Sequence, residues 1–348
     1  MQYFLYPLMW VYSIIIRLRN FLFDKKILRS TAFQIPTIVV GNLRVGGTGK
    51  TPHVDYLLQL LRSEFMVSSL SRGYGRKTKG FREVSVDDKS YESGDEPLQL
   101  KIKHPEIPVF VGEKRVDAIR KICRQKPEIK AIVLDDAFQH RSLKAGFNIV
   151  LTEHSKLFSE DKLLPVGRLR EPVKGIERAD CVIVTKCPRY FRDIDTDIVI
   201  KKLNLPKALP VFFSYVKNGR LYPLIGHENV PHPNLVEEVL LVCGIANPYP
   251  LIQFLEENYE EVNTLIFRDH HNYTTADMLK IMQRFQSIAC KNKIIITTEK
   301  DAIRLKDLDP VKAWNKMPIY VLPIEVSFKG DYGEKFNELI LDYVRKNS

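Results

Sequence analysis

The segment "VGNLRVGGTGKTP", residues 40–52, joins the end of an apolar run to a glycine-rich stretch and the start of a helical pattern. Glycines let backbone N–H groups approach an anion, a lysine reaches the outer phosphates and a hydroxyl binds Mg²⁺, all at a helix N-terminus. The segment therefore predicts a phosphate-binding loop (P-loop). The nucleotide would be bound by Gly46, Gly47, Thr48, Gly49, Lys50 and Thr51.

Arg44 departs from the usual form of this loop. It stands where the pattern G-x-x-x-x-G-K-[ST] has its first glycine, and Val45 replaces the lysine of the variant K-G-G-x-G-K. A merely structural glycine turn is the alternative interpretation. We favour nucleotide binding because the context of strand, loop and helix holds around the departure.

Apolar runs typical of buried strands alternate with helical patterns through the first half of the chain. The runs stand at 36–42, 66–71, 107–112, 131–136, 147–152 and 180–186. Such alternation predicts an α/β fold in which helices cover both faces of a parallel sheet. Ligands of such sheets bind at the carboxyl ends of the strands. We therefore expect a sheet like that of P-loop NTPases.

The segment "VFFSYVKNGRLYPL" (211–224) holds two short β-like runs around Asn218-Gly219, which predicts a β-hairpin. A second α/β series with apolar runs follows it. We expect four parts: an N-terminal apolar and basic helix, the P-loop core, the hairpin linker and a smaller C-terminal α/β domain. Their bounds are 1–35, 36–210, 211–224 and 225–348.

The N-terminal segment 1–16 carries no charged side chain and is followed by Arg17, Arg19 and further basic residues. It is short for a membrane-spanning helix, which needs about 20 apolar residues. A secretory signal would place its positive charge before the apolar run rather than after it. Two alternatives stay open, a helix buried in the protein and one in the membrane interface, and we favour the interface.

Overall charge favours an anionic partner. The chain has 53 Lys and Arg against 42 Asp and Glu, a formal charge of +11. Phosphate, nucleic acid and an acidic membrane would all suit such a surface. We expect no nucleic-acid binding, because the basic residues are scattered and no aromatic-basic module is present. The 5 cysteines form no C-x-x-C pair, which indicates neither a zinc site nor a disulfide framework.

The segment "AIVLDDAFQH" (131–140) ends an apolar run in Asp135 and Asp136. A carboxylate at a strand end holds Mg²⁺ beside a P-loop, directly or through water. We therefore expect a magnesium site formed by Thr51 with Asp135 or Asp136. A GTP-specific signature would need an aspartate where "TKCP" (185–188) has Pro188, so ATP is favoured.

Three further polar segments could contribute to a site or be ordinary surface loops. They are "SRGYGRKTKGFR" (71–82), "SGDEP" (93–97) and "RDHHNY" (268–273). A histidine beside carboxylates can polarise a general base or bind a metal, although a solvated loop histidine is commoner.

Taken together, these segments give the chain its resemblance to the tetraacyldisaccharide 4'-kinase family, membrane-associated enzymes that phosphorylate the lipid A disaccharide precursor. The chain contains, in the order typical of that family, "GNLRVGGTGKTP", "SRGYGR", "GDEP", "LDDAFQHR", "GRLREP", "DHHNY" and "TTEKDA". Each motif is short, but the set is specific and runs through both expected domains.

The resemblance implies an enzyme that uses ATP and Mg²⁺ to phosphorylate the 4'-hydroxyl of tetraacyldisaccharide 1-phosphate. It implies that residues 1–29 rest on the membrane as a helix, and that the protein is peripheral and monotopic on the cytoplasmic face of the bacterial inner membrane. We expect a monomer. A kinase for a soluble small molecule and a nucleotide-driven maturation factor remain the alternatives.

The resemblance also implies roles for single residues. Lys50 would act in catalysis on the β/γ-phosphates, Asp95 would take the proton of the 4'-hydroxyl, and His270 would pair with Asp95 from the other domain, with His271 in reserve. The nucleotide and lipid headgroup pocket would be lined by Arg72, Tyr74, Arg76, Arg115, His140, Arg170 and Glu171.

Overall fold

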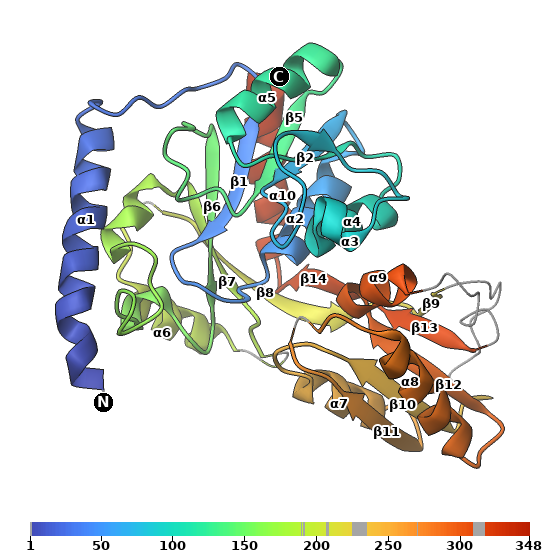
Figure 1. The fold of residues 1–348 in the computed structure, drawn as a ribbon. Helices are drawn as coiled ribbons and strands as arrows, with labels where there is room; N and C mark the ends of the chain where they lie inside the picture. Colours follow the sequence, from blue (N-terminus) through green and yellow to red (C-terminus); the bar gives the residue numbers. More distant parts are fainter. Residues whose placement is uncertain are drawn as a thin grey trace.

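A nine-stranded sheet and a five-stranded sheet form the framework of the computed structural model (Figure 1). The structure describes residues 2–188, 190, 192–206, 209–224, 235–269, 271–308 and 317–348. The larger sheet has the order β14-β8-β7-β6-β1-β5-β2-β4-β3, and the smaller has β11-β10-β12-β13-β9.

The larger sheet is parallel from β4 through β8, with antiparallel pairing at both edges. Its strands are β1 (Thr37–Asn42), β2 (Val67–Ser71), β3 (Arg82–Glu83), β4 (Val109–Val111), β5 (Ala131–Asp135), β6 (Phe147–Glu153), β7 (Cys181–Thr185), β8 (Val211–Asn218) and β14 (Ile324–Phe328). All six apolar runs expected to be strands in this half are strands. The predicted α/β class with a parallel sheet is confirmed.

Helices cover both faces of this sheet, as the continuous apolar strands require. Ile38 and Val40 of β1 point to one face, and Val39 points to the other. The first face packs against α2 (Lys50–Leu61), α4 (Asp95–Lys103) and α10 (Tyr332–Asn347). The second packs against α5 (Arg115–Gln125) and α6 (Asp193–Leu203), while the short α3 (Ser90–Ser93) lies beside α4.

The smaller sheet has its own core on two faces, lined by Leu240 and Val242 on one side and by Val239 and Leu241 on the other. Its strands are β9 (Tyr222–Pro223), β10 (Glu238–Cys243), β11 (Glu261–Ile266), β12 (Lys293–Thr298) and β13 (Ile319–Leu322). Its helices are α7 (Tyr249–Glu256), α8 (Thr275–Ser287) and α9 (Glu299–Asp307).

The expected hairpin at 211–224 is wrong. β8 pairs with β7 and β14, whereas β9 pairs with β13, so the chain passes from one sheet to the other at Asn218-Gly219. Phe213 is buried in the core of the larger sheet and Leu224 in that of the smaller sheet. Burial in two separate cores thus outweighs the local tendency of the Asn-Gly turn to pair its flanks.

The expected C-terminal domain of residues 225–348 extends too far. β14 adds to the edge of the larger sheet (Figure 1). Helix α10 packs Phe336, Ile340 and Val344 into the core of that sheet. The chain therefore returns to the P-loop core after β13. The apolar face of α10 covers sheet surface that would otherwise be exposed, which explains the return.

Helix α1 (Tyr6–Asp24), preceded by the short 3₁₀ helix η1 (Gln2–Leu5), lies along one side of the molecule, away from the smaller sheet (Figure 1). None of its residues counts as buried. Its outward side exposes Leu8, Trp10, Val11, Ile14, Ile15, Leu18 and Phe21. Among the described residues, no helix has the length and apolar character needed to cross a membrane.

The buried His53 ties the start of α2 to β8. Its Nδ1 donates to the Gly49 carbonyl at 2.7 Å, and its Nε2 lies 3.0 Å from Ser214 Oγ. Burial lowers the pKa of His53 to about 4, against its usual 6.5, while the hydrogen bond to Gly49 acts in the opposite direction. The imidazole is therefore neutral in the folded protein at neutral pH.

This burial predicts a loss of stability in mild acid. The unfolded chain binds a proton at His53 before the folded chain does, so the free energy of unfolding falls as the pH drops from about 6.5 to about 4. We expect His53 to contribute about 2 kcal/mol of that loss between about pH 7.5 and about pH 5. Urea unfolding of the wild type and of His53→Gln measures it, because the variant should lose less on acidification. Equal losses in the two proteins would contradict this assignment.

Candidate active site

A cleft of about 560 Å³ opens at the carboxyl ends of β1, β2 and β5. Parallel pairing places Val40 of β1 opposite Asp135 of β5, so the segments that follow these strands emerge at the same edge. The lining residues are Lys50, Ser71, Arg72, Gly73, Tyr74, Glu96, Pro97, Glu113, Arg115, Asp135, Asp136, Gln139, His140 and Arg170. The cleft is therefore strongly charged, with both signs present.

Hydrogen bonds from β1 and β7 hold the glycine-rich loop in place, and two of its glycines are exposed. Asn42 Nδ2 donates to Thr48 Oγ1 at 2.9 Å, and Thr185 Oγ1 donates to the Thr48 carbonyl at 2.9 Å. Gly46 and Gly49 have φ angles of 124° and 86°, a region that glycine occupies without strain. Gly46 and Gly47 are exposed, so their backbone N–H groups can approach a bound anion.

Arg44 fastens this loop to the segment 161–170. Its Nε donates to Asp161 Oδ2 at 2.5 Å, and its Nη1 lies 3.8 Å from Glu153 Oε2. The following residue, Val45, donates its backbone N–H to the Arg168 carbonyl at 2.8 Å. The departure from the strict pattern therefore replaces a glycine with an ionic anchor.

Two adjacent aspartates at the end of β5 have different surroundings. Asp136 Oδ1 lies 3.8 Å from Lys50 Nζ and accepts a hydrogen bond from Arg170 Nη1 at 2.8 Å. Asp135 is buried, and its Oδ2 accepts from Thr51 Oγ1 at 3.4 Å. Burial, reinforced by the nearby Glu96, raises the pKa of Asp135 to about 7. Asp136 is thus already paired with cations, whereas Asp135 is not.

The Asp135 and Thr51 pair fits a magnesium ion. Asp135 Oδ1 is buried and accepts no hydrogen bond from the described residues, so it can take a ligand. Over the same part of the chain, no group of three or more His, Cys, Asp or Glu side chains could hold a metal alone. Mg²⁺ binds through one or two carboxylates, water and substrate phosphates, so Asp135 and Thr51 supply oxygen atoms of the kind it takes.

Arginines and a neutral histidine also line the cleft. Arg115 is buried and donates to the Gly112 carbonyl at 2.5 Å; burial and the nearby Arg72 lower its pKa to about 10. Burial and the neighbouring arginines lower the pKa of His140 to about 4. Tyr74 is 83% exposed at the rim. This concentration of positive charge suits an anionic ligand.

Two residues expected in the pocket do not line the cleft but support it. Arg76 pairs with Glu113 and with the Gly80 carbonyl. Glu171 is buried and accepts hydrogen bonds from Arg178 Nη2 at 2.8 Å and Gln139 Nε2 at 2.9 Å. Both hold other lining residues in place.

Asp95 begins α4 at the side of the cleft, next to the lining residue Glu96. Its carboxylate accepts a hydrogen bond from Arg304 Nε of α9 at 3.0 Å. His271 bonds instead to Asp277 Oδ2, at 3.0 Å. His270 lies outside the described residues, so its pairing with Asp95 stays a prediction.

Glu96, Gln139 and Glu113 line the cleft although they were not among the expected site residues. Glu96 adjoins Asp95 in "GDEP" and Gln139 adjoins His140 in "LDDAFQH", so their positions in these motifs could have indicated them. Glu113 follows β4 and offered no comparable signal.

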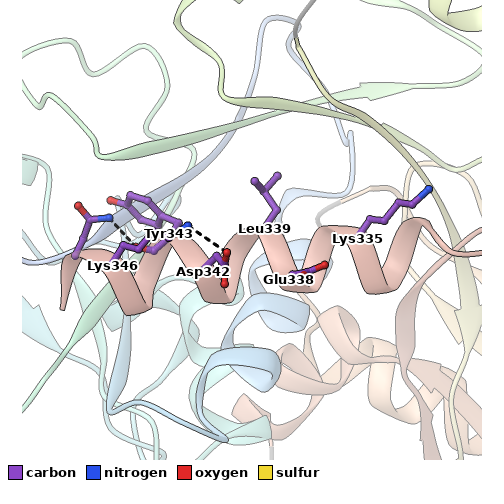
Figure 2. Close-up of a pocket in the computed structure, with 7 residues that line it drawn as sticks. Lys335, Glu338, Leu339, Asp342, Tyr343 and Lys346 are labelled. Atoms are coloured by element: carbon purple, nitrogen blue, oxygen red, sulfur yellow. Dashed lines mark hydrogen bonds and ion pairs between the residues drawn. The ribbon is translucent and has the colours of Figure 1, made fainter.

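A second hollow, of about 470 Å³, lies on α10 and is lined by residues of that helix alone (Figure 2). Its polar side chains pair locally: Lys346 Nζ donates to Asp342 Oδ2 at 3.2 Å, and Asn347 Nδ2 donates to the Tyr343 carbonyl at 2.7 Å. Because it contains no residue of the P-loop or of the polar motifs, we take the cleft beside Lys50 as the candidate site.

The chain is similar to known proteins over its whole length. The profile of the tetraacyldisaccharide-1-P 4'-kinase family matches residues 1–345. Tetraacyldisaccharide 4'-kinase from Phocaeicola vulgatus is 45% identical over 99% of this chain and 95% of the relative. The enzymes of that name from Bacteroides thetaiotaomicron and Flavobacterium johnsoniae are 42% and 39% identical, each over 99% of this chain and over 93% and 97% of the relative.

A solved structure is similar to the same extent. The crystal structure of LpxK from Aquifex aeolicus in complex with ATP matches with a TM-score of 0.76 at 30% identity, over 99% of each chain.

The anchoring of Arg44 predicts that restoring the strict pattern weakens the site. Arg44→Gly would lose the ionic anchor of the loop and should lower affinity for Mg-ATP by roughly five- to thirty-fold, since hydrogen bonds between charged groups are the strong ones. Calorimetric titration with an ATP analogue measures this. Arg62→Ala, which removes an exposed arginine paired with Glu106 at the far end of α2, is the control. Unchanged affinity in Arg44→Gly would show that the anchor has no part in binding.

Proposed function

This chain belongs to the tetraacyldisaccharide-1-P 4'-kinase family, and we propose here how the residues of its cleft perform the family's reaction. It is an ATP-dependent kinase that phosphorylates the 4'-hydroxyl of tetraacyldisaccharide 1-phosphate, a step of lipid A biosynthesis. The observation that carries the assignment of the site is the meeting of Lys50, at the end of the P-loop, with Asp135 and the arginines in one cleft. The match over the whole chain favours this function over a kinase for a soluble small molecule or a maturation factor.

The P-loop is proposed to hold the phosphates of ATP. The backbone N–H groups of residues 46–49 and the Lys50 ammonium would contact the β- and γ-phosphates. Bound Mg²⁺ would neutralise charge on the phosphoryl oxygens, held by Thr51 and Asp135. Asp136 would instead position Lys50 and Arg170, with which it pairs. The pairing of Asp136 with cations supports Asp135 as the metal ligand of the two that the sequence left open.

Asp95 is the proposed general base. It begins α4 beside Glu96, at the border of the cleft, where a carboxylate can accept the proton of the attacking 4'-hydroxyl. Arg72, Arg115 and Arg170 would stabilise the charge of the transferring phosphoryl group, which is the main catalytic demand of this reaction. His270 stays the predicted partner of Asp95. Because Asp95 belongs to the P-loop core and its described partner Arg304 to α9 of the smaller-sheet part, we propose that closure of these two parts of the chain excludes water during transfer.

We propose that the N-terminal helix holds the cleft close to the membrane surface. Tyr12 Oη donates to the Arg170 carbonyl at 2.7 Å, and Arg19 Nη2 donates to the Gln139 carbonyl at 2.8 Å. Both acceptors belong to residues that line the cleft. The opposite side of α1 exposes large apolar side chains, as an interfacial helix does. A lipid held by its acyl chains at α1 would present its sugar headgroup near the cleft.

We propose that the protein is peripheral and monotopic, and that it acts as a monomer on the cytoplasmic face of the bacterial inner membrane, where ATP is available. The exposed apolar side of α1 supports attachment to one leaflet. Arg19, one of the basic residues that follow the apolar run, donates to the protein itself at the Gln139 carbonyl.

The role of Asp95 is tested by incubating purified protein with Mg-ATP and tetraacyldisaccharide 1-phosphate and counting phosphates on the lipid by mass spectrometry. The wild type should add one phosphate at the 4' position. Asp95→Asn should lower kcat by at least about a hundredfold, since it removes the general base. The exposed Asp87→Asn is the matched control. ATP consumption without lipid product would contradict the function, and near-normal kcat in Asp95→Asn would contradict the base.

Membrane binding of α1 is tested with Ile14→Glu. Ile14 is 64% exposed on the outward side of the helix, and loss of its burial in lipid should weaken binding to anionic vesicles at least about tenfold. Co-sedimentation with vesicles measures the change. Leu279→Glu serves as control, because Leu279 is 52% exposed on α8 near the smaller sheet. An equal loss in both variants would argue against α1 as the membrane contact.

A further inference from the structure

Helix α9 of the smaller sheet packs against α3 and α4 of the P-loop core. Several polar contacts between described residues cross this seam. Lys300 Nζ lies 3.3 Å from Glu96 Oε1, Lys103 Nζ lies 3.2 Å from Glu299 Oε1, and the Ser90 backbone N–H donates to Asp307 Oδ2 at 3.0 Å. Lys89 Nζ lies 3.8 Å from Asp307 Oδ1, and a further ion pair joins Arg304 to Asp95. The N-terminal end of α4, with its proposed base, is therefore held by the smaller-sheet part of the chain.

Arg304 is built into this seam rather than lying on its surface. Arg304 is 6% exposed, and its guanidinium Nη1 also donates to the His271 carbonyl at 3.4 Å. Burial alone would lower its pKa, but Asp95, Asp301 and Tyr273 raise it, so the side chain stays cationic. Asp301 is itself engaged by the Gly244 N–H, Tyr273 Oη and Thr298 Oγ1. Among the described residues, Asp95 is a carboxylate to which Arg304 donates directly.

The two hydrogen bonds from Arg304 end on the same oxygen of Asp95. Nε donates to Oδ2 at 3.0 Å, and Nη2 donates to the same atom. Within the described part of the chain, Oδ1 accepts no hydrogen bond from another side chain. A rigid guanidinium that holds Oδ2 from two nitrogens restrains the rotation of the carboxylate, which a single-point contact would not do.

We propose that Arg304 is a positioning residue for phosphoryl transfer: it fixes Oδ2 of Asp95 so that Oδ1 takes the proton of the substrate hydroxyl. This inference rests on the proposed role of Asp95 as general base. It makes the docking of α9 on α4 a condition for an oriented base. The smaller-sheet part of the chain then contributes to catalysis through the contact of the buried Arg304 with Asp95, independently of His270.

The test compares Arg304→Gln and Arg304→Lys with wild type in the lipid phosphorylation assay. Arg304→Gln should lower kcat roughly ten- to a hundredfold, as expected for loss of a charged hydrogen bond, with KM for ATP and for lipid changed less than about threefold. Arg304→Lys, which keeps the charge without the fork, should recover part of kcat. Arg284→Lys is the control, an exposed arginine of α8 bonded to Asn263.

The Asp95→Asn background separates this inference from the proposed function. There Arg304→Lys should have no further effect on kcat, because the two residues act as one unit. Active Asp95→Asn would overturn the base assignment itself. If Asp95→Asn is inactive while Arg304→Gln and Arg304→Lys keep the wild-type kcat, only the role of Arg304 is overturned. An effect of the Arg304 variants on KM alone would overturn that role too. Thermal unfolding checks that the variants fold. If Arg304→Gln does not fold, the kcat of Arg304→Lys alone tests the role of Arg304.

Discussion

The parallel pairing of β1 with β5 is the constraint on which the site depends. It sets Val40 opposite Asp135, so the P-loop and the two aspartates leave the sheet together although they lie far apart in the sequence. β2 pairs with the other side of β5 and brings the segment of Arg72 to the same edge. A slip of one residue would turn buried side chains toward the wrong face, and the two apolar cores of this sheet oppose such a slip. Packing of the sheet therefore determines the geometry of the phosphate site.

Much of this arrangement could be predicted from sequence because it is encoded locally. Strand-like runs, the glycine-rich loop and the Asp135-Asp136 pair each depend on neighbouring residues, and parallel topology brings the strand ends together. The hairpin at Asn218-Gly219 was mispredicted because its two flanks are buried in different cores. The return of β14 and α10 to the larger sheet was missed for a related reason, since an amphipathic helix does not reveal which sheet it covers.

Contacts between residues far apart in the sequence could not be predicted for the side chains of the candidate site either. The sequence could indicate that Arg44 departs from the loop pattern, but its ionic contact with Asp161 depends on a loop more than a hundred positions away. Asp135 and Asp136 were equivalent in sequence and differ only in burial and partners. The sequence does not indicate that Arg304 lies beside Asp95. The two residues meet because α9 packs against α4, and no short sequence motif encodes that packing.

Three parts of the chain thus converge on one cleft: α1 from the proposed membrane side, the P-loop core, and α9 from the smaller sheet. A crystal structure with a non-hydrolysable ATP analogue, Mg²⁺ and tetraacyldisaccharide 1-phosphate tests this convergence most directly. The account predicts that the 4'-oxygen lies within about 3.2 Å of Asp95 Oδ1, with the γ-phosphate beside Lys50. A 4'-oxygen bound against another group, with Asp95 turned away from it, would contradict the account.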